Sequence, residues 1–146
     1  MKKLLLLTTL FLAFACSKDD ESGETFFKKY DGYSWKNGSE IQGITNGTYF
    51  FTFVDYSDPD DIECVKLKEG VQTIDGIQAE VVVSKNEPDE LIMEIKIDGV
   101  VRSRNRWNVN GETLTDRTTY FDEDGSSSEE TYTWTRTNAS YSDYCN

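Results

Sequence analysis

The chain has 146 residues, no histidine and a formal net charge of −12, with 15 basic residues against 27 acidic ones. This length suits a single domain. The acidic balance argues against nucleic-acid binding, because phosphates need a basic face. The lack of histidine excludes His-containing catalytic triads, histidine metal sites and the commonest general base.

Residues 1–15 have the three parts of a signal peptide. Lys2 and Lys3 give a positive start, residues 4–14 form an apolar run, and small residues precede position 16. The run is shorter than the ~20 apolar residues that a membrane-spanning helix needs, so we exclude it from the fold. Its removal lowers the basic residues from 15 to 13 and takes the net charge from −12 to −14.

Cys16 is the predicted site of lipid attachment. Residues 12–16 resemble a lipobox, in which the cysteine thiol is acylated and becomes the first residue after cleavage; plain secretion with a free Cys16 is the alternative. Residues 16–24 form an acidic tether, and its early run of Asp and Glu resembles the export signal of bacteroidete-type surface lipoproteins. We therefore expect an outer-membrane lipoprotein whose membrane partner is reached through the anchor, and the sequence leaves the leaflet open.

The number of cysteines supports export and lipid anchoring. The chain has three cysteines, and an odd thiol is a liability in an oxidising compartment. A lipid on Cys16 leaves Cys64 and Cys145 as an even pair. We predict that they form a disulfide joining the C-terminal tail to the middle of the chain, with two free thiols as the alternative.

The remaining domain, residues 25–146, is predicted to be all-β. A short helix is expected over residues 24–30, after which apolar and polar residues alternate with period two between Asn-Gly and Asp-Gly turns. Eight or nine strands in sequence order suggest an antiparallel up-and-down meander that closes into a small barrel. The expected strands cover residues 33–36, 48–55, 62–68, 72–74, 78–84, 91–97, 101–109, 113–121 and 130–137.

The hairpin around Asp98-Gly99 allows two registers. A three-residue loop over 97–99 pairs Lys96 with Val100 and sets Arg102 opposite Glu94, which separates apolar from charged side chains. A two-residue loop pairs Ile97 with Val100 and brings three arginines, at positions 102, 104 and 106, beside the apolar face. We predict the first register; inward arginines would instead indicate an anionic ligand.

The next hairpin predicts a mixed interior. A two-residue Asn110-Gly111 turn pairs Trp107 with Leu114, Asn105 with Asp116, and residue 101 with residue 120. The resulting inner face is apolar at one end and polar midway. A small ligand cavity would have this character, and buried water would explain it equally well.

No motif indicates catalysis. The chain has neither a nucleophile elbow nor a phosphate-binding glycine loop, and most carboxylates are expected in turns or on outer faces, where they make poor general acids. The acidic loops over residues 55–61 and 122–125 have oxygen ligands of the kind that Ca²⁺ prefers, but solvated turns are the simpler interpretation. We therefore expect no enzyme, no metal and no cofactor.

Three sequence features resemble the lipocalin-like domains of small bacterial lipoproteins. They are Gly32-x-x-Trp35 after the short helix, Tyr132-x-Trp134-x-Arg136 on the last strand, and the tail that carries Cys145. The resemblance implies that Trp35 packs under Arg136 and closes one barrel end by cation–π stacking. An exposed, unstacked Arg136 is the alternative.

The predicted function is non-catalytic binding at the envelope. A small, partly apolar ligand would lie in a barrel cavity lined by Met93, Trp107, Leu114 and Tyr120. The rival is a surface module with a filled core that contacts protein or glycan. A cavity of ~300 Å³ or more favours the ligand site. The sequence does not indicate an oligomeric state.

Overall fold

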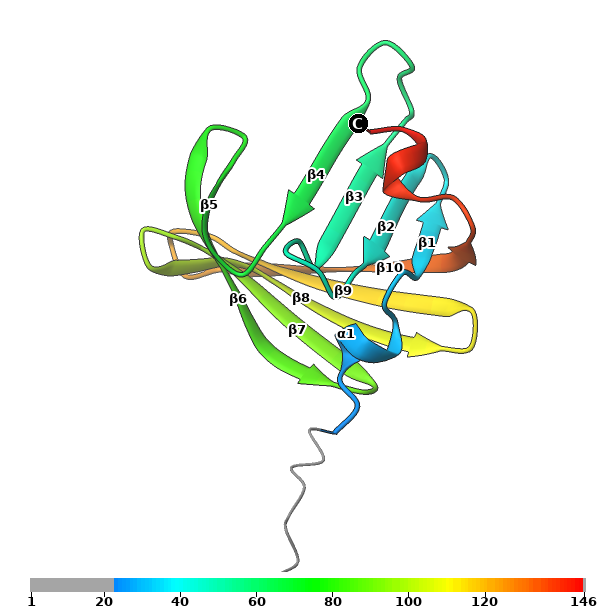
Figure 1. Cartoon of the computed structure of the whole chain (residues 1–146). Coiled ribbons are helices and arrows are strands. Elements are labelled where there is room, and N and C mark those ends of the chain that lie inside the picture. The colour runs from blue at the N-terminus through cyan, green and yellow to red at the C-terminus, as the bar shows by residue number, and fades with distance from the viewer. Residues whose placement is uncertain (1–22, 146) are drawn as a thin grey trace, which may run out of the picture.

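Ten strands dominate the part of the chain that the computed structural model describes, residues 23–145 (Figure 1). The predicted all-β meander with a short N-terminal helix is confirmed. The helical elements are α1 (Phe26–Lys29) and the 3-10 turn η1 (Tyr141–Asp143). The strands are β1 (Ser34–Asn37), β2 (Glu40–Ile44), β3 (Phe51–Asp55), β4 (Glu63–Leu67), β5 (Gly70–Ile74), β6 (Ile77–Glu87), β7 (Glu90–Ile97), β8 (Val100–Asn110), β9 (Thr113–Phe121) and β10 (Ser127–Thr137).

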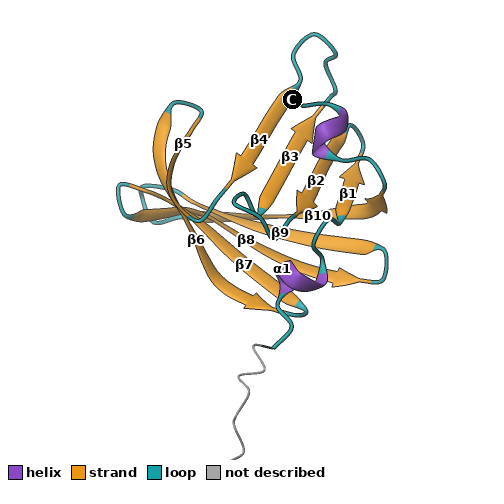
Figure 2. Ribbon diagram, in the orientation of Figure 1, coloured by secondary structure: helices purple, strands orange, loops and turns teal. Residues whose placement is uncertain are grey.

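All of these strands join one antiparallel sheet, in the order β4-β3-β2-β1-β10-β9-β8-β7-β6-β5. Pairing of β1 with β10 links the first strand to the last. β4 and β5 follow each other in the chain, yet they form the two edges of the sheet and share no ladder. The sheet therefore curls into a half-barrel with one open seam between β4 and β5 (Figures 1 and 2).

β2 is the strand that the sequence analysis missed. Its residues include a glycine and only two apolar side chains, so the alternation is too short to recognise. The structure shows why the glycine is there: a Cβ atom on Gly43 would lie 2.8 Å from Oγ1 of Thr52 on β3. The hydroxyl of Thr52 therefore occupies the space that a side chain at position 43 would need.

The turn between β7 and β8 corrects the predicted register. Asp98 and Gly99 both have positive φ, at 53° and 76°, as a two-residue type I′ turn requires. Ile97 therefore pairs with Val100, and the predicted pairing of Lys96 with Val100 is wrong. The strong preference of Asp-Gly for this tight turn outweighed the side-chain segregation on which the prediction was based.

A bulge then restores that segregation. The register shifts between Ile95 and Lys96, which leaves Arg102 as the extra residue. Glu94 consequently pairs with Arg104, and not with Arg102 as predicted. An extra residue in one strand exchanges its faces beyond the bulge. The arginines of β8 thus form ion pairs on the outer face, including a 2.7 Å contact between Glu94 and Arg104.

The turn between β8 and β9 lies one residue later than predicted. Asn110 pairs with Thr113, so the partner of each β8 residue is shifted by two positions. Trp107 pairs with Asp116, in place of Leu114, and Asn105 pairs with Thr118, in place of Asp116. A shift of two keeps every side chain on its predicted face, because the period of a strand is two.

The main core lies inside the curl, and α1 covers one end of it (Figure 1). Thr25 caps the helix by accepting a hydrogen bond from the backbone N–H of Lys28. Phe26 is fully buried, and its ring centroid lies 4.6 Å from that of Tyr30. The helix is shorter than the predicted 24–30 because it is held by packing of its aromatic side chains and not by its own length.

A second, smaller cluster lies on the outer face of β2 and β3. Ile41 and Val54 pair across these strands, and the C-terminal tail covers them. Cys145 is bonded to Cys64 on β4, with Cα atoms 6.1 Å apart, so the predicted disulfide is confirmed. The bond holds the tail against the sheet and links it to an edge strand.

Candidate functional site

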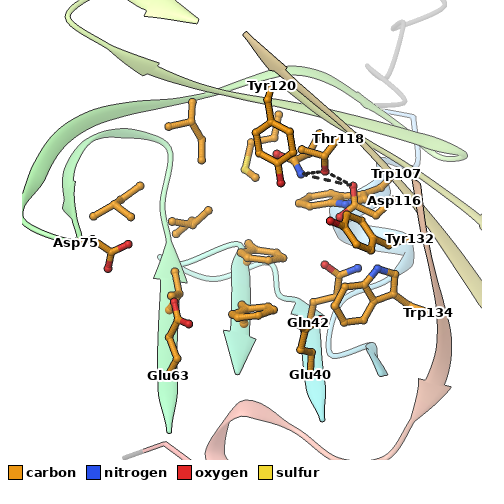
Figure 3. Close-up of a pocket in the computed structure, with 18 residues that line it drawn as sticks. Glu40, Gln42, Glu63, Asp75, Trp107, Asp116, Thr118, Tyr120, Tyr132 and Trp134 are labelled. Atoms are coloured by element: carbon orange, nitrogen blue, oxygen red, sulfur yellow. Dashed lines mark hydrogen bonds between the residues drawn. The ribbon is translucent and has the colours of Figure 1, made fainter. Parts of the chain in front are cut away.

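A cavity of about 450 Å³ opens inside the half-barrel, between β2–β4 on one side and β7–β10 on the other (Figure 3). Of the four predicted lining residues, Met93, Trp107 and Tyr120 line it. Leu114 does not. It is 2% exposed, pairs with Trp134, and belongs to the main core.

Aromatic rings form much of the cavity wall. The rings of Phe51 on β3 and Trp107 on β8 are stacked, with centroids 5.3 Å apart and planes inclined by 14°. These strands are not neighbours in the sheet, so the stacking bridges the two sides of the curl. Phe53, Tyr132 and Trp134 add further rings to the wall. Of these rings, only Trp107 was predicted from the sequence to line the cavity.

A hydrogen-bonded polar cluster lies within this wall. Asn105 donates to the hydroxyl of Thr118 at 2.6 Å, and that hydroxyl donates to Asp116 at 3.2 Å. Asp116 is only 6% exposed. Burial raises the pKa of its carboxyl, while the nearby donors of Trp107, Asn105 and Thr118 offset part of the increase. This cluster is the polar middle of the inner face that the sequence predicted.

Three buried N–H groups of the wall have no hydrogen-bond partner within the described protein. They are Nε2 of Gln42 and the indole Nε1 atoms of Trp107 and Trp134. The indole of Trp107 is near enough to Asp116 to lower its pKa, but it makes no hydrogen bond of ordinary geometry. Nearly all buried polar groups in proteins are hydrogen-bonded, and a fourth such donor, the indole Nε1 of Trp35, lies in the main core outside this cavity.

Carboxylates line the opposite side of the cavity. Glu63 and Asp75 lie across from Asp116 in Figure 3, Asp75 in the β5–β6 turn, and Glu40 lies below Gln42. Burial raises the pKa of Glu40, and the negative charges of Asp55 and Glu63 raise it further. The sequence analysis did not predict this group, because its members come from the missed β2, an edge strand and a turn.

Arg136 lies beside Trp35 where β1 pairs with β10, but another aromatic ring is nearer to its guanidinium. Trp35 and Arg136 are direct partners in the ladder. The guanidinium carbon of Arg136 lies 3.2 Å from the ring centroid of Tyr33 and 5.8 Å from that of Trp35. Tyr33 therefore provides the nearer ring. The lipocalin-like motif gave no signal for Tyr33, although it is two residues before Trp35 and shares its face.

The two acidic loops form self-contained turns. Asp58 accepts a hydrogen bond from the backbone N–H of Asp60, and Asp124 accepts one from that of Ser126. Within residues 23–145, no group of three or more Asp, Glu, Cys or His side chains is arranged to hold a metal ion.

The predicted lipid site, Cys16, lies outside the described residues, as do the signal segment and most of the tether. No helix in the described part of the chain is long and apolar enough to cross a membrane.

Comparison with models of protein families finds no match for the chain, and comparisons with curated proteins and with solved structures find none either.

Proposed function

We propose that this chain is a non-catalytic envelope lipoprotein that holds a small, partly apolar ligand in the cavity of its half-barrel. The observation that carries the proposal is the cavity itself. Its volume of about 450 Å³ falls within the roughly 300–1,000 Å³ typical of small-molecule sites. A few polar groups set into an aromatic wall are also typical of such sites, whereas a filled core would favour the rival interaction module.

Anchoring through Cys16 is the second part of the proposal. The signal-like segment before Cys16 and the acidic run after it support the anchor. The Cys64–Cys145 disulfide adds support, because it leaves Cys16 as the third cysteine of the chain. An N-terminal lipid would hold the protein at the outer membrane, where its high negative charge keeps it from adsorbing to anionic lipid.

Native mass spectrometry of the protein purified from its own membrane tests both parts. We expect an acylated Cys16 at the N-terminus and a small molecule that is released on collisional activation. An unmodified N-terminus would refute the anchor. A protein that never carries a retained molecule would refute the ligand cavity.

A pair of variants tests whether the retained molecule is bound in this cavity. Val65→Trp places a large side chain in the cavity wall and should abolish the retained molecule. Val71→Trp makes the same change on β5, where the side chain is 59% exposed and does not line this cavity. It should leave the retained molecule in place. Equal retention by both variants would show that the molecule binds elsewhere.

A further inference from the structure

The charges that line the cavity all have the same sign. Glu40, Glu63, Asp75 and Asp116 line it, and no lysine or arginine of the described chain does. None of these four carboxyl groups takes part in an ion pair among residues 23–145. The arginines of β8 are instead paired with acidic partners on the outer face. The interior therefore presents negative charge without the neutralising cations that the exterior has.

The walls between these carboxyl groups are suited to a positive charge. Phe51, Phe53, Trp107, Tyr132 and Trp134 present aromatic rings to the cavity. The face of an aromatic ring attracts a cation through its quadrupole, and the attraction strengthens when water is excluded. An anion would meet both the ring faces and the carboxylates unfavourably.

A second, independent observation is that buried donors of the cavity wall lack acceptors within the described protein. Gln42 and Trp134 are 3% and 4% exposed, both line the cavity, and each has a side-chain N–H without a hydrogen-bond partner in the described protein. Buried donors need acceptors. A ligand that carries an ether or hydroxyl oxygen on its apolar body can supply one. Figure 3 shows Gln42 and Trp134 on the same side of the cavity, apart from Glu63 and Asp75.

We propose that the ligand of this cavity is an organic cation, with an apolar body against the aromatic wall and a protonated amine facing the carboxylates of Glu40, Glu63 and Asp75. The inference rests on the proposed ligand-binding function and names the chemical class of the ligand. The charge pattern selects an amine over a carboxylate of the same size, and the aromatic wall selects it over a bare inorganic cation.

Three probes with the same number of carbon atoms test the charge. They are 3-phenoxypropylamine, 3-phenoxypropanol and 3-phenoxypropionate, which share an ether oxygen and an apolar ring and differ at one end. Binding to the full-length gene product, purified from its producing cells, is followed by tryptophan fluorescence, since Trp107 and Trp134 line the cavity. We expect the amine to bind about tenfold more tightly than the alcohol and the acid to bind most weakly.

A matched pair of variants locates the effect. Glu63→Gln removes a carboxylate at the cavity and should weaken binding of the amine about fivefold while leaving the alcohol unchanged. Glu112→Gln removes the same charge from the exposed β8–β9 turn and should change neither.

Each other outcome has a defined meaning. Equal binding of amine and alcohol, or a preference for the acid, would overturn the cationic ligand while leaving a ligand cavity in place. Failure of the amine to saturate any signal would also overturn it. The proposed function is judged separately by the molecule that the native protein retains: a neutral or anionic molecule there would support the cavity and refute the cation.

Discussion

Removal of the Cys64–Cys145 disulfide should cost the protein much of its stability. The bond joins residues 81 positions apart, and closing a loop of that length is worth about 4.5 kcal/mol in the chain-entropy model. Since small domains are stable by only about 5–15 kcal/mol in total, the variant Cys64→Ser/Cys145→Ser should be strongly destabilised but still able to fold.

Most of this loss should arise in the unfolded state. The folded tail keeps other contacts, among them the stacked rings of Tyr56 and Tyr144, whose centroids lie 4.5 Å apart. Cys145 also packs against Ile41 and Val54, and serine there loses only part of that contact. An unfolded chain without the cross-link is more expanded, so the denaturant dependence of the unfolding free energy should become steeper.

Urea unfolding followed by tryptophan fluorescence measures both quantities. The control is the unaltered protein with its disulfide reduced, which should match the double variant. A loss smaller than about 1 kcal/mol in both samples would refute the reasoning, because the cross-link would then not restrict the unfolded chain.

Three further predictions concern single side chains. Burial raises the folded-state pKa of Asp116, so folding favours its protonated form. The contribution of Asp116 to stability therefore falls as the pH rises above ~3.9, the ordinary aspartate value. Asp116→Asn should raise the melting temperature more at pH 7 than at pH 4, and an equal change at both pH values would contradict this. Phe26→Ala removes the fully buried ring with which α1 packs into the core and should cost about 3–5 kcal/mol in urea unfolding. Val100→Ala, at a side chain 52% exposed, should cost about 0.5 kcal/mol or less. Arg136→Ala should lose about 0.5–2 kcal/mol of cation–π attraction. In a double-mutant cycle with Tyr33→Leu, the two losses of unfolding free energy should be coupled. Strictly additive losses would mean that the 3.2 Å contact does not contribute to stability.

The sequence predicted those parts of the fold that depend on local chemistry. Period-two alternation located nine of the strands. Asp98-Gly99 marked the place of a turn, although the three-residue loop predicted there was wrong. The bulge at Arg102 was not predictable, because an extra residue depends on how the strands twist around the whole curl. β2 was missed for a related reason: Gly43 is required by the approach of β3, which no local pattern reveals.

The residues of the candidate site were likewise predictable only where local alternation shows the inner face. Met93, Trp107 and Tyr120 were found because alternation on β7–β9 gives the inner face directly. Leu114 shares that face, but it packs in the main core and does not line the cavity. Alternation does not show where along a strand the cavity lies. Gln42, Glu40 and Glu63 reach the cavity only because β1 pairs with β10, which is a contact between distant parts of the chain.

The central claim is that a ligand occupies the cavity, and nuclear magnetic resonance of the tryptophan indole N–H groups tests it most directly. The chain has three tryptophans; two line the cavity, while Trp35 is buried in the main core and does not line it. On titration with 3-phenoxypropylamine or 3-phenoxypropanol, the indole signals of Trp107 and Trp134 should shift and saturate together while that of Trp35 stays in place. Unchanged signals with both probes, or equal shifts of all three, would contradict the account.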